Sequence, residues 1–255
     1  MRNAEMEEVL SQFDLIDLTE MDGVQLMNRV DTKFVFDSDV LTEILPVLQG
    51  HFKVLNVGES MISGYESLYY DDPELRFYND HHRKRLNRVK VRYRTYLESG
   101  ISFLEVKHKH KGRTNKMRIP SNENHMELPT DHQAFLDSVM PFDTDPLNPS
   151  LMNQYQRITL VGKDQDERLT IDLALRFEWK DRKEDMGKLV IAELKQGRIN
   201  RESPFFRIMK QRGIRPLRLS KYCIGMLKIH GAGALKHNRF KKKLLHIEKL
   251  ENDAA

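Results

Sequence analysis

Residues 89–119 read VKVRYRTYLESGISFLEVKHKHKGRTNKMRI, and they indicate the fold more clearly than any other part of the chain. Three stretches within them alternate apolar and charged side chains: 89–98, 102–110 and 115–119. A period of two is typical of antiparallel strands with one apolar face. Gly100 and Gly112 lie in the short turns between the stretches. We therefore predict an antiparallel β-meander in the middle of the chain.

The same alternation returns on both sides of the meander. Further strands are predicted at 29–36, 65–70, 153–161, 168–177 and 189–195. Helices are predicted, from apolar residues at a spacing near 3.6 and from capping residues, at 4–22, 38–49, 74–85, 131–140, 203–212, 219–229 and 236–252. The proline-rich segment 120–150 is interpreted as a surface connection and not as a domain boundary.

The polar faces of the predicted strands carry rows of cations with acids among them. The aligned sets are Arg29, Asp31 and Lys33; Lys90, Arg92 and Arg94; Glu105 and Lys107; Lys116 and Arg118; Tyr155 and Arg157; Arg168, Thr170 and Asp172; and Glu193 and Lys195. A row of like charges is costly, more so in an enclosed space, unless a polyanion or a metal supplies the countercharge. If the sheet closes with these faces inward, it forms a positively lined tunnel.

Two interpretations of these rows stay open at this point. In the tunnel, the acids are hard oxygen ligands for Mg²⁺ or Mn²⁺, and the frequent arginines suit bidentate contacts with phosphate. The alternative is a flat sheet with a solvated charged face, because exposed cross-strand ion pairs are common and contribute little.

Composition narrows the class of protein. The 255 residues allow one large domain or two small ones, and 42 basic against 38 acidic residues give a net charge of only +4. This balance, with carboxylates interspersed among the cationic rows, argues against a nucleic-acid partner. Cys223 is the single cysteine, which excludes a disulfide framework within the chain and a multi-cysteine metal site and favours a cytoplasmic location. No stretch is long and apolar enough for a transmembrane helix.

Taken in order, these motifs resemble the VTC domain, the polyphosphate polymerase domain of the triphosphate tunnel metalloenzyme superfamily. The resemblance runs from about Arg29 to Leu227. Its pieces are Asp31-Thr32-Lys33, Val91-Arg92-Tyr93-Arg94, Leu104-Glu105-Val106-Lys107, Lys116-Met117-Arg118, Tyr155-Gln156-Arg157, Arg168-Leu169-Thr170-Ile171-Asp172, Glu193-Leu194-Lys195 and Ser220-Lys221-Tyr222.

The resemblance implies an α+β fold. Its core would be a closed, mainly antiparallel eight-stranded β-barrel, the triphosphate tunnel, surrounded by helices. One domain would span 1–255, with an N-terminal helix in 1–25, the barrel and its packing helices in 29–229, and a basic C-terminal helix or tail in 230–255.

The function implied is a metal-dependent polyphosphate polymerase, which transfers the γ-phosphate of ATP to a growing polyphosphate chain with Mn²⁺ or Mg²⁺. The resemblance implies catalytic contacts to phosphate from Arg92, Arg94, Lys107, Lys116, Arg157, Arg168 and Lys221. It implies further phosphate-binding roles for Lys33, Tyr155, Lys195, Ser220 and Arg118. The carboxylates that would bind the metal are Glu193 and Glu105.

Other functions are kept as alternatives. A tunnel triphosphatase would use water as the acceptor, although Asp31 stands where many superfamily members carry Glu, and only one acid precedes Lys33. A non-catalytic polyphosphate-binding accessory subunit is a further alternative. A membrane-coupled polymerase would need a separate membrane partner subunit.

Two basic clusters lie outside these rows: Tyr78, His81, His82, Arg83, Lys84 and Arg85; and Lys236, His237, Arg239, Lys241, Lys242 and Lys243. We interpret them as solvated helix surface. The alternatives are an electrostatic funnel toward the tunnel or a contact with an anionic membrane.

Overall fold

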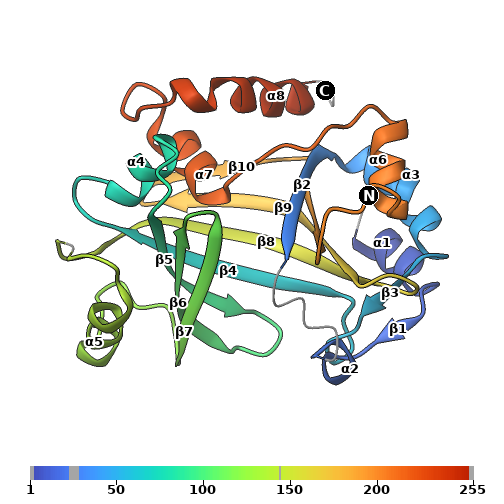
Figure 1. The fold of residues 1–255 in the computed structure, drawn as a ribbon, viewed down its shortest axis with the longest axis horizontal. Coiled ribbons are helices and arrows are strands. Elements are labelled where there is room, and N and C mark those ends of the chain that lie inside the picture. Colours follow the sequence, from blue (N-terminus) through green and yellow to red (C-terminus); the bar gives the residue numbers. More distant parts are fainter. Residues whose placement is uncertain (1–2, 23–28, 144, 253–255) are drawn as a thin grey trace.

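A single, mainly antiparallel sheet runs through the structure, a computed structural model that describes residues 3–22, 29–143 and 145–252 (Figure 1). Its strands are β1 (Leu15–Ile16), β2 (Val30–Asp37), β3 (Phe52–Leu55), β4 (Ile62–Asp71), β5 (Arg88–Tyr96), β6 (Ser102–His110), β7 (Arg113–Ser121), β8 (Asn148–Gly162), β9 (Glu167–Trp179), β10 (Arg182–Asp185) and β11 (Leu189–Gln196). The main path is β2-β11-β9-β8-β4-β5-β6-β7, and β1, β3 and β10 are short additions to it.

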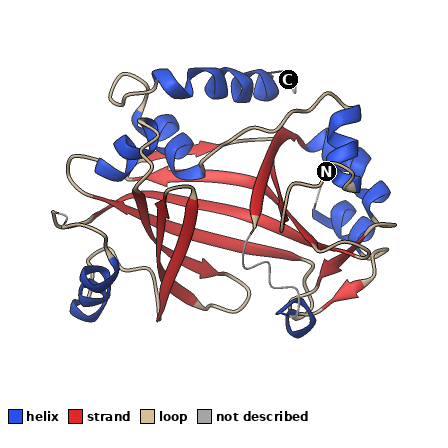
Figure 2. Ribbon diagram, viewed as in Figure 1, coloured by secondary structure: helices blue, strands red, loops and turns tan. Residues whose placement is uncertain are grey.

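The main path has the eight strands expected, but closure into a barrel is not confirmed. Within the described residues, no backbone pairing joins the two edge strands, β2 and β7. The sheet is nevertheless strongly curled, because β2 and the β5–β7 meander both stand in front of β4, β8 and β9 (Figures 1 and 2). We call the face enclosed by this curl the inner face.

Helices cover both faces of the sheet. They are α1 (Asn3–Leu10), α2 (Leu18–Asp22), α3 (Ser38–Leu48), α4 (Arg76–His82), α5 (Thr130–Val139), α6 (Pro204–Gln211), α7 (Lys221–His230) and α8 (Lys241–Asn252), with a 3₁₀ turn η1 (Asn238–Phe240). On the outer face, α1, α3 and α6 pack around Phe34, and α5 packs near Tyr93. The apolar residues of the alternating strands therefore face outward, toward helices.

Helix α7 occupies one part of the inner face. Tyr222, Cys223 and Met226 are buried there with Phe177 and Leu151, so Cys223 is the small core residue that its apolar helical position predicts. At Gly225, an added Cβ would lie 2.4 Å from Phe177 Cδ1, so only glycine allows the helix this close to the sheet. The start of α7 consequently projects into the remaining, charged part of the inner face.

Three local details differ from the sequence prediction. The predicted helix 4–22 is divided, since α1 ends at Leu10 and Leu15–Ile16 pair in parallel with β3. The short strands β3 and β10 were not predicted. Helix α3, for which the sequence predicts Ser38 or Asp39 as the cap, is capped instead by Asp37, which accepts hydrogen bonds from the amides of Asp39 at 2.8 Å and Val40 at 3.0 Å.

Candidate active site

The charged rows of seven strands meet on the inner face. Contacts join most of the residues that the sequence nominates: Lys33, Arg92, Arg94, Glu105, Lys116, Tyr155, Arg157, Glu193, Lys195, Ser220 and Lys221. Arg118 is exposed instead, with its guanidinium 4.2 Å from the ring centroid of Phe103. Lys107 and Arg168 are considered below, with the cations that have no carboxylate partner.

The first ion-pair group is built around Glu105 on β6, whose side chain is fully buried. It accepts hydrogen bonds from Arg92 Nε at 3.0 Å and Nη2 at 2.8 Å, and it pairs with Lys116 of β7. Burial raises the pKa of Glu105, but Arg92, Arg94 and Lys116 outweigh it and hold that pKa below its usual range. Glu105 is therefore an anion that fixes two cations in place.

The second group is built around Asp172 on β9. Its carboxylate accepts two hydrogen bonds from Arg157, from Nε at 2.5 Å and Nη2 at 2.8 Å, and it pairs with Lys221 at the start of α7. The Lys221 ammonium also lies 3.2 Å from the centroid of the Tyr155 ring. Burial raises the pKa of Asp172, but Arg157 and Lys221 more than offset this and keep it ionised.

The third group is built around Glu193 on β11. Glu193 lies opposite Lys33 of β2 in the sheet and pairs with it, and its second oxygen is 3.3 Å from Lys195 Nζ. Lys195 Nζ also donates to Thr170 Oγ1 at 2.8 Å. Each of the three groups thus fixes two cations on one carboxylate, a preorganised set of charges that need not rearrange when an anion binds.

Apart from Lys90, whose ammonium donates to Ser220, three cations of the inner face have no carboxylate partner among the described residues: Arg94, Lys107 and Arg168. Arg94 donates from Nη2 to Tyr155 Oη at 3.0 Å, and its buried Nε has no hydrogen-bond partner. The buried Nε of Arg168 likewise has none. Arg92 and burial together lower the pKa of Lys107 well below its usual value. Unpaired buried charge is unfavourable, so a bound anion would stabilise the two arginines and the protonated form of Lys107.

The carboxylates fit a divalent cation only in part. Among residues 3–22, 29–143 and 145–252, no group of three or more His, Cys, Asp or Glu side chains could hold a metal ion. The described residues therefore contain no metal site that is coordinated entirely by protein side chains. Mg²⁺, however, is commonly held by one or two carboxylates together with the phosphates of a substrate. Each of these carboxylates lies between two cations, but Glu193 fits that arrangement better because its side chain is 16% exposed whereas that of Glu105 is fully buried.

The sequence-based site list omitted several side chains that the structure places in the site. Asp172 and Lys90 share their faces with Arg168 and Arg92, so the alternation alone could have added them. Lys90 Nζ donates to Ser220 Oγ at 2.7 Å. Tyr69 accepts a hydrogen bond from Arg92 Nη1 at 3.1 Å. The sequence could not identify Tyr69 as a site residue, because an aromatic residue in a strand is usually part of a core.

Comparisons with known proteins identify the family of this chain and some structures similar to it. A family model described as the VTC domain matches residues 28–230. A Hippeastrum candidate adenylyl cyclase, described as having a dominant triphosphatase activity, aligns with a TM-score of 0.50 at 11% identity, covering 81% of this chain and 97% of its own. A candidate adenylate cyclase from Bacillus halodurans aligns with a TM-score of 0.46 at 11% identity, covering 76% and 96% respectively.

The likeness to the Hippeastrum structure concerns the fold alone, because the identity is low. No match to a curated protein reaches significance. In the described part of the chain, every helix is too short or too polar to cross a membrane.

Proposed function

This chain belongs to the VTC domain family, and from that premise we propose that it is a polyphosphate polymerase that uses ATP. The observation that carries the proposal is the set of three inner cations without a carboxylate partner, Arg94, Lys107 and Arg168, lying among cations already fixed by carboxylates. A chain of phosphates supplies negative charge at several neighbouring positions, which a single carboxylate ligand cannot do. Bidentate arginine contacts suit phosphate oxygens in particular.

In the proposed reaction, the terminal phosphate oxygen of a polyphosphate chain attacks the γ-phosphorus of ATP. A new P–O bond forms to the chain, the bond between the γ-phosphorus and the bridging oxygen breaks, and ADP leaves with that electron pair. The attacking oxygen is already ionised, so the step needs no general base. Arg94 and Arg168 would hold the transferring phosphate in line, which is the main contribution of proteins to this chemistry.

Glu193 would hold Mg²⁺ or Mn²⁺ together with the phosphates, and the cation would neutralise charge that develops on the phosphate oxygens. Lys33 and Lys195 hold the Glu193 carboxylate in position. Burial raises the pKa of Glu193, but these two lysines lower it well below the usual range, so the ligand stays ionised at neutral pH.

Incubation of the purified chain with ATP and Mn²⁺ or Mg²⁺ tests the proposal. We expect polyphosphate and ADP to accumulate together, one ADP for each phosphate added. Orthophosphate with ADP and no polymer would contradict polymerisation and indicate hydrolysis. No turnover combined with tight binding of polyphosphate would also contradict it and would indicate a binding subunit.

Binding of phosphate is expected to weaken as the pH rises above neutrality. Burial lowers the pKa of Lys221 to about 7, against the opposing effect of Asp172, and burial lowers that of Lys195 to about 8, against Glu193. A bound phosphate favours the protonated lysines, so binding above pH 7 takes up protons. The contribution of each lysine to the affinity for tripolyphosphate should fall by up to about tenfold per pH unit above its pKa, and the ionisation of the terminal phosphates, with a pKa of about 6, is measured separately and subtracted.

Calorimetric titration at pH 8 in two buffers of different ionisation enthalpy measures this proton uptake. Lys221→Arg keeps its charge at all these pH values and should show less uptake and a flatter pH profile. An absence of proton uptake in the unaltered chain, or a release of protons, would contradict the assignment of these lysines.

A further inference from the structure

A second group of basic residues lies beside the first residues of β5, before the strand reaches the ion pair of Arg92. We call it the rim cluster: His81 of α4, Lys84 after α4, Arg88 and Lys90 of β5, Lys109 of β6, Arg218 before α7, and Lys243 of α8. Arg88 lies directly opposite Lys109 on the neighbouring strand, an arrangement of like charges that is unfavourable by itself. The cluster thus brings together six cations and His81 from four elements and from two connections between elements.

The rim cluster differs from the inner site in lacking countercharge. Each cation of the three ion-pair groups shares a carboxylate, whereas no ion pair involves a rim residue within the part of the chain that the structure describes. The hydrogen bonds that Lys90 and Arg88 do donate go to neutral oxygens, Ser220 Oγ at 2.7 Å and the carbonyl of Arg85 at 2.6 Å. The positive charge at the rim is therefore available to an external anion.

A buried, unpartnered polar atom points to the same conclusion. His81 Nδ1 is buried without a hydrogen-bond partner. Burial lowers the pKa of His81, and Lys90, Arg88 and Lys243 lower it further, so the ring is neutral and would contribute a hydrogen bond and not a charge. The Phe240 ring places the start of α8 beside α4, because its centroid lies 6.2 Å from that of the His81 ring and 5.3 Å from Lys243 Nζ.

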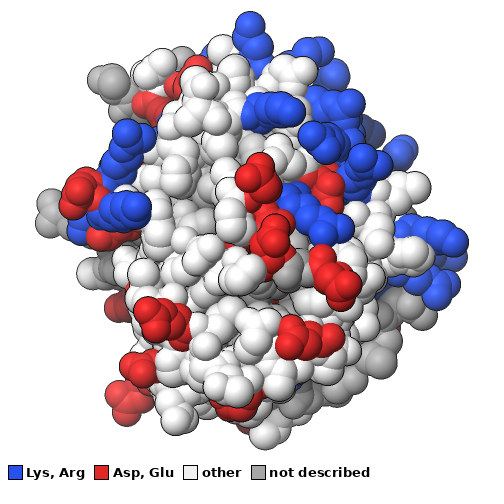
Figure 3. Space-filling view, turned by 90° about the vertical axis from the view of Figure 1, so that its left-hand side faces the viewer, with Lys and Arg blue, Asp and Glu red and all other residues white. Residues whose placement is uncertain are grey.

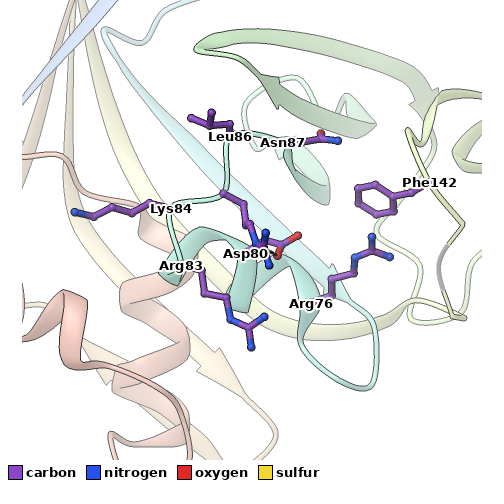
Figure 4. A pocket seen from close by; sticks show the side chains of 8 residues that line it. Arg76, Asp80, Arg83, Lys84, Leu86, Asn87 and Phe142 are labelled. Carbon is purple, nitrogen blue, oxygen red and sulfur yellow. Dashed lines mark ion pairs between the residues drawn. The ribbon is translucent and has the colours of Figure 1, made fainter.

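The pictures show how this end of the molecule is charged. Lys and Arg gather in its upper part, whereas its lower part is mostly uncharged with scattered acids (Figure 3). A pocket next to the α4–β5 connection is lined by Arg76, Asp80, Lys84 and Phe142 among others, so Lys84 belongs both to this pocket and to the rim cluster (Figure 4). Unlike the rim cluster, the pocket also contains a carboxylate, that of Asp80, and the Arg76 guanidinium lies 3.7 Å from the centroid of the Phe142 ring.

The length of the cationic row on β5 indicates what kind of anion would contact both the inner site and the rim cluster. Arg88, Lys90, Arg92 and Arg94 alternate along one face of β5, and six residues of strand span about 20 Å. A triphosphate covers only part of that distance, whereas a longer phosphate chain that starts at Arg94 continues over Lys90 and Arg88. Lys243 then adds charge from α8, which lies beyond the residues 28–230 matched by the family model.

We propose that the rim cluster is a docking site for the distal phosphates of a polyphosphate chain whose end lies in the inner site. The inference rests on the proposed function and adds to it a preference for long chains. Such a second contact raises the affinity for a long chain without changing the affinity for a short one, because only the long chain reaches both regions.

The test compares Arg218→Gln/Lys243→Gln with a matched variant, Lys241→Gln/Lys242→Gln, which removes the same charge from the exposed start of α8. Binding of tripolyphosphate and of long-chain polyphosphate is measured by calorimetry at fixed salt. We expect the rim variant to lose about tenfold or more in affinity for the long chain and to bind tripolyphosphate as before. The matched variant should bind both ligands within about twofold of the unaltered chain.

Three results would overturn the proposal: equal losses for both ligands, no loss for either, or an equal loss in the matched variant. Single-stranded RNA that binds as tightly as long-chain polyphosphate, and loses the same affinity in the rim variant, would show a nucleic-acid surface instead. The proposed function fails separately, if the unaltered chain makes no polyphosphate from ATP while the length-dependent loss in the rim variant persists.

Discussion

Arg94→Ala is expected to lower the rate of polyphosphate synthesis by about 100-fold to 1,000-fold while the protein stays folded. Arg94 has no carboxylate partner among the described residues, and it donates only to Tyr155 Oη. Its removal therefore takes away a contact to phosphate without leaving a buried carboxylate unpaired. Initial rates of ADP and polymer formation at saturating ATP, together with a denaturation curve, measure both effects.

Two further variants sharpen this prediction. Arg94→Lys keeps the charge but loses the planar fork, so it should recover only part of the rate. Arg176→Ala removes an exposed arginine on β9 that pairs with exposed Asp185 at 2.8 Å, and it should leave the rate unchanged. A rate for Arg94→Ala within about twofold of the unaltered chain would exclude Arg94 from the reaction.

Glu105→Ala is expected to lower the free energy of unfolding by about 3–5 kcal/mol. Arg92 is only 6% exposed, and without Glu105 its guanidinium stays buried with no carboxylate. Lys116, whose side chain is 36% exposed, can turn to solvent, so the cost comes mainly from Arg92. Chemical denaturation followed by circular dichroism measures the difference.

The control for this variant is Glu178→Ala. Glu178 forms an exposed ion pair with Lys183 at 2.9 Å, and its loss should cost about 0–1 kcal/mol. If Glu105 instead served mainly as a metal ligand, Glu105→Ala would keep its stability and need more Mn²⁺ for activity. That outcome would refute the ion-pair role that we assign to it.

The faces of the strands could be predicted from the sequence because a period of two assigns each residue to one side. Tyr93 lies on the outer side, where its hydroxyl is 2.6 Å from Nδ1 of His132 in α5. Its neighbours Arg92 and Arg94 lie on the inner side. The ion pair between Arg92 and Glu105 also follows from one hairpin, through its register. Local pattern therefore accounts for this part of the site.

The other groupings depend on the order of strands in the sheet. Lys33 and Glu193 are 160 residues apart and meet only because β11 lies between β2 and β9. Lys221 reaches Asp172 because Gly225 lets α7 approach the sheet closely. Closure of the barrel could not be predicted either, because it depends on pairing between edges that are distant in the sequence. Which cations keep a carboxylate partner, and which do not, is therefore a property of the folded chain.

Because Arg94, Lys107 and Arg168 have no carboxylate partner, the fraction of molecules that is folded should depend on whether an anionic ligand is bound. Their mutual repulsion weakens the empty native state, and a polyanion that binds only that state stabilises it by mass action, about 2.7 kcal/mol at 100 times its dissociation constant. A difference of this size lowers the unfolded fraction, the part that proteases can cleave, by about 100-fold. We therefore expect a protease to digest the empty protein faster than the protein that has polyphosphate bound.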